Sequence, residues 1–212
     1  MKKVTAVGLD LAKSVFQVHG ADEDGRAVLR KALKRGQVAE FFAQLPPCTV
    51  GMEACGSAHH WARKLRELGH EVRLIAPQYV KPFVKRNKTD AADAEAICEA
   101  MGRPGMRFVP VKTTEQQSIL SVHRVRQGFV RARTAMANQV RGLLAEFGIV
   151  VARGIENIPR LRSAMMDQAL PGTFRQLVDI QLHHLGEIQD RIDELDRQIA
   201  RWHRESYRLS GS

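Results

Sequence analysis

The first hundred residues alternate short apolar runs of strand length with amphipathic segments. The runs predict five strands, at residues 4–9, 15–19, 27–33, 48–52 and 71–76. Apolar residues at helical spacing predict three helices, at residues 38–45, 58–68 and 90–101. The resulting order, β-β-β-α-β-α-β-α, predicts an α/β fold whose sheet begins as an antiparallel meander and carries helices on its faces.

After the break at 103–105 and Pro110 the pattern is helical and predicts no strand. Apolar residues between Ile119 and Phe147 recur at multiples of three, four and seven. The segment 148–172 carries glycines and prolines, so we expect a connector with one short helical piece. A second apolar set then repeats 3-4-3-4-3, a coiled-coil seam that predicts oligomerisation, at Leu185, Ile188, Ile192, Leu195, Ile199 and Trp202. We therefore expect an α/β domain over 1–105 and an all-α coiled-coil region over 106–212.

The amino-acid composition predicts a polyanionic partner. The chain has 33 Lys and Arg against 23 Asp and Glu, a formal charge of +10, with an ordinary 44% of apolar residues. No apolar run approaches the roughly 18 residues of a membrane helix, and Asp10 interrupts the first one too early for a signal peptide. Cys48, Cys55 and Cys98 form no CxxC and cannot all pair, which predicts free thiols in a cytoplasmic protein.

Four acidic residues stand where an ordinary surface would not need them. Asp10 ends the first strand and Glu53 the fourth, each after an apolar run that contains a glycine. Asp90 and Asp93 lie at i and i+3, on one face at the start of a helix. If strands one and four are neighbours, all four carboxylates converge at one end of the sheet. Three of them also have an ordinary interpretation, as a helix cap for Asp90 or a solvent-facing strand end for Asp10 and Glu53.

Converging carboxylates imply a shared cation. Like charges that close would take up protons unless a hard metal with oxygen ligands lies between them, which predicts Mg²⁺ or Mn²⁺. Two such ions about 4 Å apart would support phosphoryl transfer. His59 and His60 are adjacent on a helix, where their side chains diverge, so we expect them at a packing or entry surface rather than on the metal.

Positive charge is clustered in two places that suit a phosphate backbone. The first cluster flanks the predicted site and consists of Lys81, Lys85, Arg86 and Lys88. Lys13, on the tight turn near Asp10, is a further candidate for a phosphate contact, and exposure without function is its alternative. The second follows the first long helix and consists of Arg124, Arg126, Arg131, Arg133 and Arg141. Residues 113–162 hold eight Arg against three Glu, so we expect salt-dependent nucleic-acid binding there rather than only a solvated helix face. The last helix mixes both signs of charge around its seam, which favours protein pairing.

Three sequence blocks resemble the DEDD transposases of bacterial insertion sequences, which are related to Piv-type invertases. The blocks are AVGLDLAKS at 6–14, VGMEACG at 50–56 and KTDAADA at 88–94, and further matches extend to residue 148. The resemblance implies an RNase H-like (RuvC-like) mixed sheet with flanking helices. In it, Asp10, Glu53, Asp90 and Asp93 would be the catalytic metal ligands, and the coiled-coil region would dimerise and bind nucleic acid.

The same resemblance implies a function, a transposase or site-specific recombinase that cleaves and exchanges DNA strands. Its partners would be DNA, a structured bridge RNA encoded by the element, and further copies of itself as a dimer or tetramer, in the bacterial cytoplasm at the nucleoid. Family members carry a C-terminal domain with a catalytic serine, which we expect to be absent here, so no nucleophile is assigned. Two alternatives stay open, a RuvC-like structure-selective DNA endonuclease and a non-catalytic nucleic-acid-binding and assembly fragment.

Overall fold

The computed structural model divides the chain into two compact units, 1–113 and 114–212. It describes residues 3–84, 90–166 and 169–210, with the side chains of residues 90 and 206–210 excepted. The first unit is α/β and the second is helical, as the hydrophobic pattern predicted. The first unit ends at Thr113, beyond the boundary expected at residue 105.

A six-stranded mixed sheet forms the first unit, in the order β3-β2-β1-β4-β5-β6. The first three strands form an antiparallel meander, β4 is parallel to β1 and β5 is parallel to β4. This arrangement is compatible with an RNase H-like fold, and it contains all five predicted strands. The strands are β1 Ala6–Asp10, β2 Val15–Ala21, β3 Ala27–Lys34, β4 Thr49–Glu53, β5 Glu71–Ile75 and β6 Phe108–Val109.

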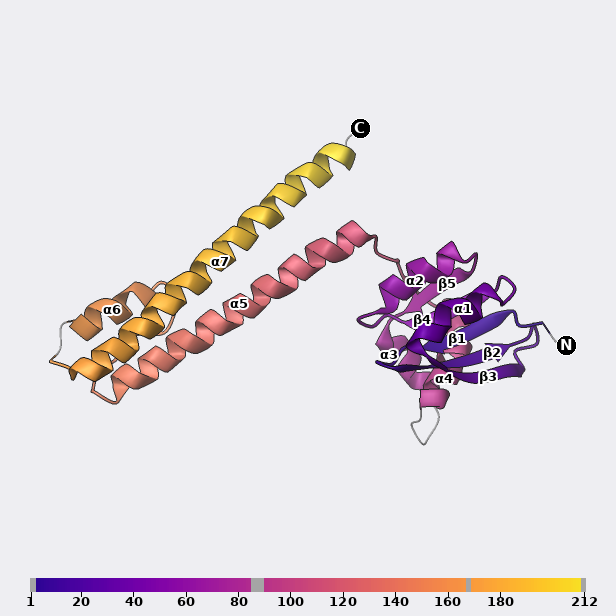
Figure 1. Ribbon diagram of the computed structural model, residues 1–212, viewed down its shortest axis with the longest axis horizontal. Helices are drawn as coiled ribbons and strands as arrows, with labels where there is room; N and C mark the ends of the chain where they lie inside the picture. The colour runs from indigo at the N-terminus through magenta and orange to yellow at the C-terminus, as the bar shows by residue number, and fades with distance from the viewer. Residues whose placement is uncertain (1–2, 85–89, 167–168, 211–212) are drawn as a thin grey trace. The chain divides into compact units, whose positions relative to one another are not determined.

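Helices cover both faces of this sheet (Figure 1). Helices α1 (Val38–Ala43) and α2 (Ala58–Glu67) pack on one face, over a core that includes Leu9, Phe16 and Met52. Helix α4 (Asp90–Met101) packs on the other face, with Ile75 and Ile97 in its core. Two short elements were not predicted between β5 and α4, the helix α3 (Pro77–Val80) and the 3₁₀ turn η2 (Lys81–Phe83). A further 3₁₀ turn, η1 (Arg35–Gln37), precedes α1.

Strand β6 corrects the expectation that the region 106–212 is all-α. It pairs antiparallel with β5, with Phe108 opposite Ile75 and Val109 opposite Leu74. The next residues stay bound to α2, because the backbone N–H of Lys112 donates to Nδ1 of His59 (3.2 Å). Two residues of strand are too few to show an alternating pattern, so hydrophobic periodicity could not reveal them.

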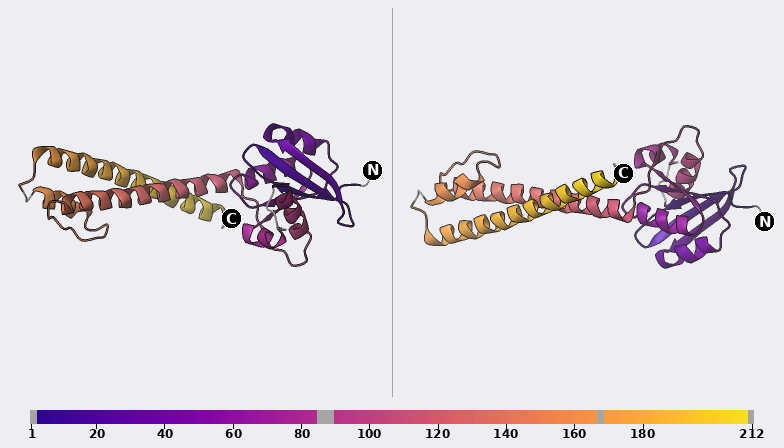
Figure 2. Two further views of the ribbon diagram at one scale, coloured as in Figure 1. Left: turned by 90° about the horizontal axis from the view of Figure 1, so that it is seen from below. Right: turned by 90° about the horizontal axis from the view of Figure 1, so that it is seen from above.

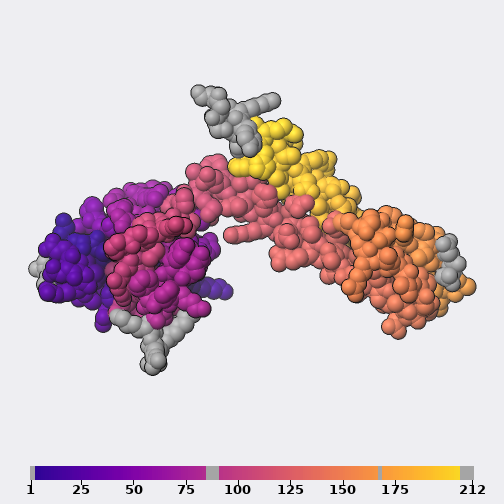
Figure 3. Space-filling view, turned by 180° about the vertical axis from the view of Figure 1, so that it is seen from behind, coloured from indigo at the N-terminus to yellow at the C-terminus, as the bar shows by residue number. Residues whose placement is uncertain are grey.

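The second unit is a helical hairpin with a third helix against one end. Helices α5 (Thr114–Ala145) and α7 (Gly172–Ser210) run antiparallel, side by side (Figure 2). The connector holds α6 (Ile158–Met166), the short helical piece that was predicted, and with α6 it covers one end of the hairpin (Figure 3, orange). The core at this end comprises Val140, Leu144, Ile149, Leu161, Met165, Val178 and Leu182.

The predicted seam of α7 is used largely within the chain. Leu185, Ile188 and Ile192 are buried on a helix whose main packing partner is α5. The remaining seam residues, Leu195, Ile199 and Trp202, are half-buried. Pairing between chains through this seam stays a prediction. Among the described helices, none is long and apolar enough to span a membrane.

Candidate active site

The carboxyl ends of β1 and β4 bring two of the predicted carboxylates together. These strands are parallel neighbours in register, with Leu9 opposite Met52. The next residue on β1 is Asp10 and the next on β4 is Glu53, and both are half-buried. Because neighbouring strands lie about 4.8 Å apart, the two carboxylates leave the sheet side by side. The condition set by the sequence, that strands one and four are neighbours, is confirmed.

Two glycines let α4 lie directly on these strands. Gly8 and Gly51 are opposite each other in the β1–β4 pair, each two residues before its acid and therefore on the same face as that acid. A β-carbon at Gly8 would clash with the carbonyl oxygen of Ala94 and lie 2.7 Å from the backbone nitrogen of Cys98. A β-carbon at Gly51 would lie 2.9 Å from Sδ of Met101. The glycines, which the sequence prediction did not single out, therefore allow the close contact between helix and sheet.

The direction of α4 points its first turn toward the two carboxylates. Its last turns line a cavity of about 780 Å³ together with Thr5 and Ala6, at the amino end of β1. The helix therefore begins toward the carboxyl end of β1, where Asp10 lies. Asp93 is half-buried next to the Gly8 contact, and Asp90 is the first residue of α4 with its side chain outside the described part.

The donor set suits a hard divalent cation. Carboxylate oxygens are the ligands that Mg²⁺ and Mn²⁺ take, and two of them leave adjacent strand ends. Among the side chains that the structure describes, which exclude Asp90, no three of His, Cys, Asp or Glu lie close enough to hold a metal. The structure thus shows Asp10 and Glu53 at the ends of adjacent parallel strands, while convergence of the four carboxylates on a metal stays a prediction.

The basic residues predicted beside the site are only partly described. Lys13 is exposed in the turn between β1 and β2, and Lys81 is exposed at the start of η2. Lys85, Arg86 and Lys88 fall outside the described residues. His59 accepts a hydrogen bond from the backbone of Lys112, a packing role in line with the expectation for this histidine.

Three of the five predicted arginines of α5 are engaged inside the helical unit. Arg126 forms a two-point ion pair with Asp196 of α7, and the same hydrogen bond and charge lower the pKa of Asp196. Arg133 donates to the side-chain oxygen of Gln189. Arg141 donates to the carbonyl oxygens of Ala152 (3.2 Å) and Gly154 (2.7 Å) and so holds the connector. Arg124 and Arg131 stay exposed.

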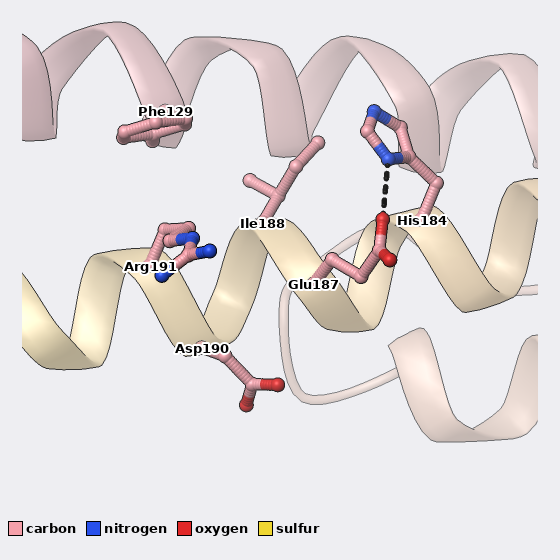
Figure 4. Close-up of a pocket in the computed structure, with 6 residues that line it drawn as sticks. All are labelled: Phe129, His184, Glu187, Ile188, Asp190 and Arg191. Atoms are coloured by element: carbon pink, nitrogen blue, oxygen red, sulfur yellow. Dashed lines mark hydrogen bonds and ion pairs between the residues drawn. The ribbon is translucent and has the colours of Figure 1, made fainter.

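A shallow pocket between α5 and α7 is a weaker candidate site. It has a volume of about 490 Å³ and an apolar wall made by Phe129 and Ile188 (Figure 4). Its polar groups pair along α7, since His184 bonds to Glu187 (2.9 Å) and Arg191 to Glu194 (3.1 Å). This pairing lowers the pKa of Glu187 and leaves no concentration of one charge in the pocket. The carboxyl ends of β1 and β4, which carry Asp10 and Glu53, are therefore the better candidate site.

Comparisons with known proteins identify the family of the chain. The family model of the IS110-type DEDD transposases, described as a transposase, matches residues 7–149. A probable family 20 transposase of Pseudomonas aeruginosa is 55% identical over 204 residues, covering 92% of this chain and 59% of that protein. The transposase for insertion sequence element IS1328 of Yersinia enterocolitica is 44% identical over 199 residues, covering 94% of this chain and 60% of that protein. The chain thus spans little more than half the length of these curated relatives.

Proposed function

The chain belongs to the DEDD transposases of insertion sequences, and from this premise we propose that it binds Mg²⁺ or Mn²⁺ through Asp10, Glu53, Asp90 and Asp93 to cleave and exchange DNA strands. One observation carries the proposal. Asp10 and Glu53 end the neighbouring parallel strands β1 and β4, and helix α4 begins near the same ends of these strands.

The protein's part in this chemistry is to hold carboxylates at fixed spacing. Asp10 and Glu53 are anchored by the hydrogen-bonded strands that precede them, and Asp93 by a helix that packs on the same strands. Carboxylates this close favour a cation between them, since two charged groups side by side repel. The bound divalent metal would supply activation of the attacking oxygen and stabilisation of the leaving oxygen in phosphoryl transfer.

Metal binding is tested by titrating the chain with Mn²⁺ in a calorimeter. The variants Asp10→Asn and Glu53→Gln keep the shape of each side chain and remove its charge, so we expect each to bind Mn²⁺ at least about tenfold more weakly. Glu71→Gln is the matched control, because Glu71 lies at the amino end of the neighbouring strand β5, away from the carboxyl ends that carry Asp10 and Glu53. Equal affinity in Asp10→Asn and the unmodified chain would refute the metal site.

Cleavage is tested with Mg²⁺ on supercoiled and branched DNA. The chain is compared with a version extended to the length of its relatives, each with and without Asp10→Asn. Activity only in the extended protein, lost in Asp10→Asn, is the result expected for a composite recombinase site. Activity of the chain alone would favour a structure-selective nuclease, and binding without cleavage at either length would favour an assembly fragment.

We also propose that the chain binds DNA together with a structured bridge RNA. The proposal rests on the family resemblance and on the exposed guanidinium groups of Arg124 and Arg131. Replacing both by Gln should weaken RNA binding and lower the salt dependence by about 0.7–0.9 per contact. The proposed setting is the nucleoid in the bacterial cytoplasm.

Assembly into a dimer or tetramer is proposed through the outer part of the α7 seam. Leu195, Ile199 and Trp202 are half-buried, so each retains apolar surface that a second copy can cover. Light scattering should report a multiple of 23.8 kDa for the chain and a smaller mass for Ile199→Glu. A monomeric mass for the unmodified chain would contradict this assembly.

A further inference from the structure

The edge strand β3 is strongly basic, a feature that the sequence prediction did not single out. Between residues 26 and 37 the chain has five basic residues and no acidic one. All five are exposed, namely Arg26, Arg30, Lys31, Lys34 and Arg35. Basic residues on an edge strand also discourage pairing with another sheet, and that role has no preference for one face of the strand. The distribution of the five basic residues between the two faces of β3 therefore distinguishes a role in preventing strand pairing from a role in binding an anion.

Strand alternation places Arg30 and Lys34 on the face that carries the carboxylates. Across the three antiparallel strands, Ala32 is opposite Gln17, which is opposite Asp10. Residues opposite one another share a face, and so do residues two apart along a strand. Arg30, Ala32 and Lys34 therefore lie on the same face as Asp10.

Lys31 and Arg35 lie on the opposite face, against α1 and α2. The ammonium group of Lys31 is 5.2 Å from the centre of the Phe41 ring. The guanidinium group of Arg35 is 5.5 Å from the centre of the Phe16 ring and a similar distance from Trp61. These two cations are thus used in packing against aromatic side chains.

The Lys34 end of the carboxylate face is open and positively charged. Helix α4 packs mainly on β1, β2 and β4. Lys34 is opposite Val15, which is 40% exposed and follows the turn that holds Lys13. Neither lysine has a carboxylate partner within the described part of the chain, whereas Arg30 pairs loosely with Glu95 of α4 at 3.7 Å. Lys34 and Lys13 are therefore available to bind an external anion near the carboxyl end of β1, which carries Asp10.

The other end of the same face is acidic. The cavity at the amino end of β1 is lined by five carboxylates, those of Asp22, Glu23, Asp24, Glu95 and Glu99. Arginines pair with three of them, Arg26 with Asp24, Arg30 with Glu95 and Arg103 with Glu99, but carboxylates stay in excess there, so a polyanion is attracted more strongly to the Lys34 end. This difference in charge therefore favours binding of a nucleic-acid strand near the carboxyl ends of β1 and β4, where Asp10 and Glu53 lie.

We propose that Lys34, together with Lys13, forms a phosphate-binding surface for the DNA strand that enters the carboxylate site. The inference rests on the proposed function, because it takes that strand to be the substrate of the site at Asp10 and Glu53. Lys34, near the carboxyl end of β1, contacts the phosphate nearest the site, and Lys13 contacts a neighbouring one.

The matched pair Lys34→Gln and Lys31→Gln tests this surface. Both variants remove one exposed positive charge from the same strand, but from opposite faces. Binding of fluorescently labelled single-stranded and duplex DNA is measured by anisotropy over a series of salt concentrations. We expect Lys34→Gln to weaken duplex binding about fivefold near physiological salt and to lower the salt slope by about 0.9, and Lys13→Gln to add to this. Lys31→Gln should stay within about twofold of the unmodified chain.

Lysine acetylation read by mass spectrometry provides a second measurement on the unmodified chain. Bound DNA should protect Lys34 and leave Lys31 as reactive as before. Equal losses in the two variants, or equal protection of the two lysines, would overturn the surface while leaving the proposed function intact. If the unmodified chain binds no DNA at any salt concentration, the proposed function itself fails, and the surface fails with it.

Discussion

At the scale of single residues, Cys48 and His70 form a polar contact that is buried in the first unit. Sγ of Cys48 lies 3.4 Å from Nδ1 of His70, while Nε2 of His70 lies 2.9 Å from the carbonyl oxygen of Phe42. Nδ1 of His70 accepts from the backbone N–H of Cys48 (3.3 Å), so the proton of the ring lies on Nε2, which donates to Phe42. Burial raises the pKa of Cys48 to about 11 and also raises that of Cys98. Neither thiol is therefore suited to act as a nucleophile at neutral pH.

The raised pKa of Cys48 predicts a loss of stability in alkali. Between the pKa of the unfolded thiol and about 11, the unfolded chain has lost the proton that the folded chain retains, so the free energy of unfolding falls as pH rises. Urea unfolding at increasing pH should show a decrease on the order of 2 kcal/mol that Cys48→Ala does not share. In the folded chain, a thiol reagent should label the half-buried Cys55 first. Rapid labelling of Cys48 at neutral pH would contradict its raised pKa.

At the scale of elements, the contact between α4 and the sheet sets the position of Asp93. Gly8→Ala places a methyl group against backbone atoms of α4, which cannot rotate away. We expect it to cost at least about 3 kcal/mol, or to displace the helix. Gly51→Ala meets mainly the flexible end of Met101, so it should cost less, about 1–2 kcal/mol. Urea unfolding measures these costs.

Mn²⁺ affinity separates a displaced helix from a merely weaker fold. In variants that stay folded, Gly8→Ala should bind Mn²⁺ more weakly, and shortening Met101 to Ala should restore part of the affinity lost in Gly51→Ala. Gly36→Ala is the control, since a β-carbon at Gly36 has no atom within 4 Å in the described structure. Unchanged Mn²⁺ affinity in folded Gly8→Ala would show that α4 does not position a ligand.

The ion pair between Arg126 and Asp196 predicts acid sensitivity of the helical hairpin. Arg126 lowers the pKa of Asp196, so the pair stabilises the fold above the pKa of an ordinary aspartate, and this stability is lost as pH falls through the lowered pKa. The side chains are 34% and 46% exposed, which limits the effect to about 1 kcal/mol. The difference in melting temperature between the chain and Asp196→Asn should shrink between about pH 7 and about pH 3. A constant difference would assign the pair no role in stability.

Elements with a repeated pattern could be predicted from the sequence, and elements without one could not. The five longer strands and the long helices follow from apolar spacing, and so does the end-of-strand position of Asp10 and Glu53. Strand β6 forms only because the edge of β5 is available, a tertiary cause that leaves no local signal. The seam of α7 predicted an apolar partner helix, but its spacing could not tell α5 of the same chain from a second copy.

At the scale of the whole molecule, each unit has its own core. The sheet unit buries residues on both faces of β1 and β4, and the hairpin buries a separate cluster between α5, α6 and α7. The sequence located the change from α/β to helix, but it set the boundary at the break near Gly105. The structure places the boundary at Thr113, because the segment between them is bound to the first unit by main-chain hydrogen bonds.

This boundary predicts a difference between two fragments of the chain. Fragment 1–113 keeps the pairing of β6 with β5, the partly buried Val109 and Val111, and the hydrogen bond from Arg63 to the carbonyl oxygen of Lys112 (2.6 Å). Fragment 1–105 lacks all of these and exposes the edge of β5. We expect fragment 1–105 to be less stable by on the order of 2 kcal/mol, which lowers its melting temperature by roughly 10 °C.

Circular dichroism of the two fragments measures this difference, and Lys112→Ala within fragment 1–113 is the control for side-chain effects. That variant keeps the backbone N–H and carbonyl groups that α2 binds, so it should melt close to the unmodified fragment. If fragments 1–105 and 1–113 melt together, the connector adds nothing to the first unit and the earlier boundary is adequate. If fragment 1–105 melts lower, β6 and the bound connector complete the sheet that carries Asp10 and Glu53, and a catalytic fragment must include them.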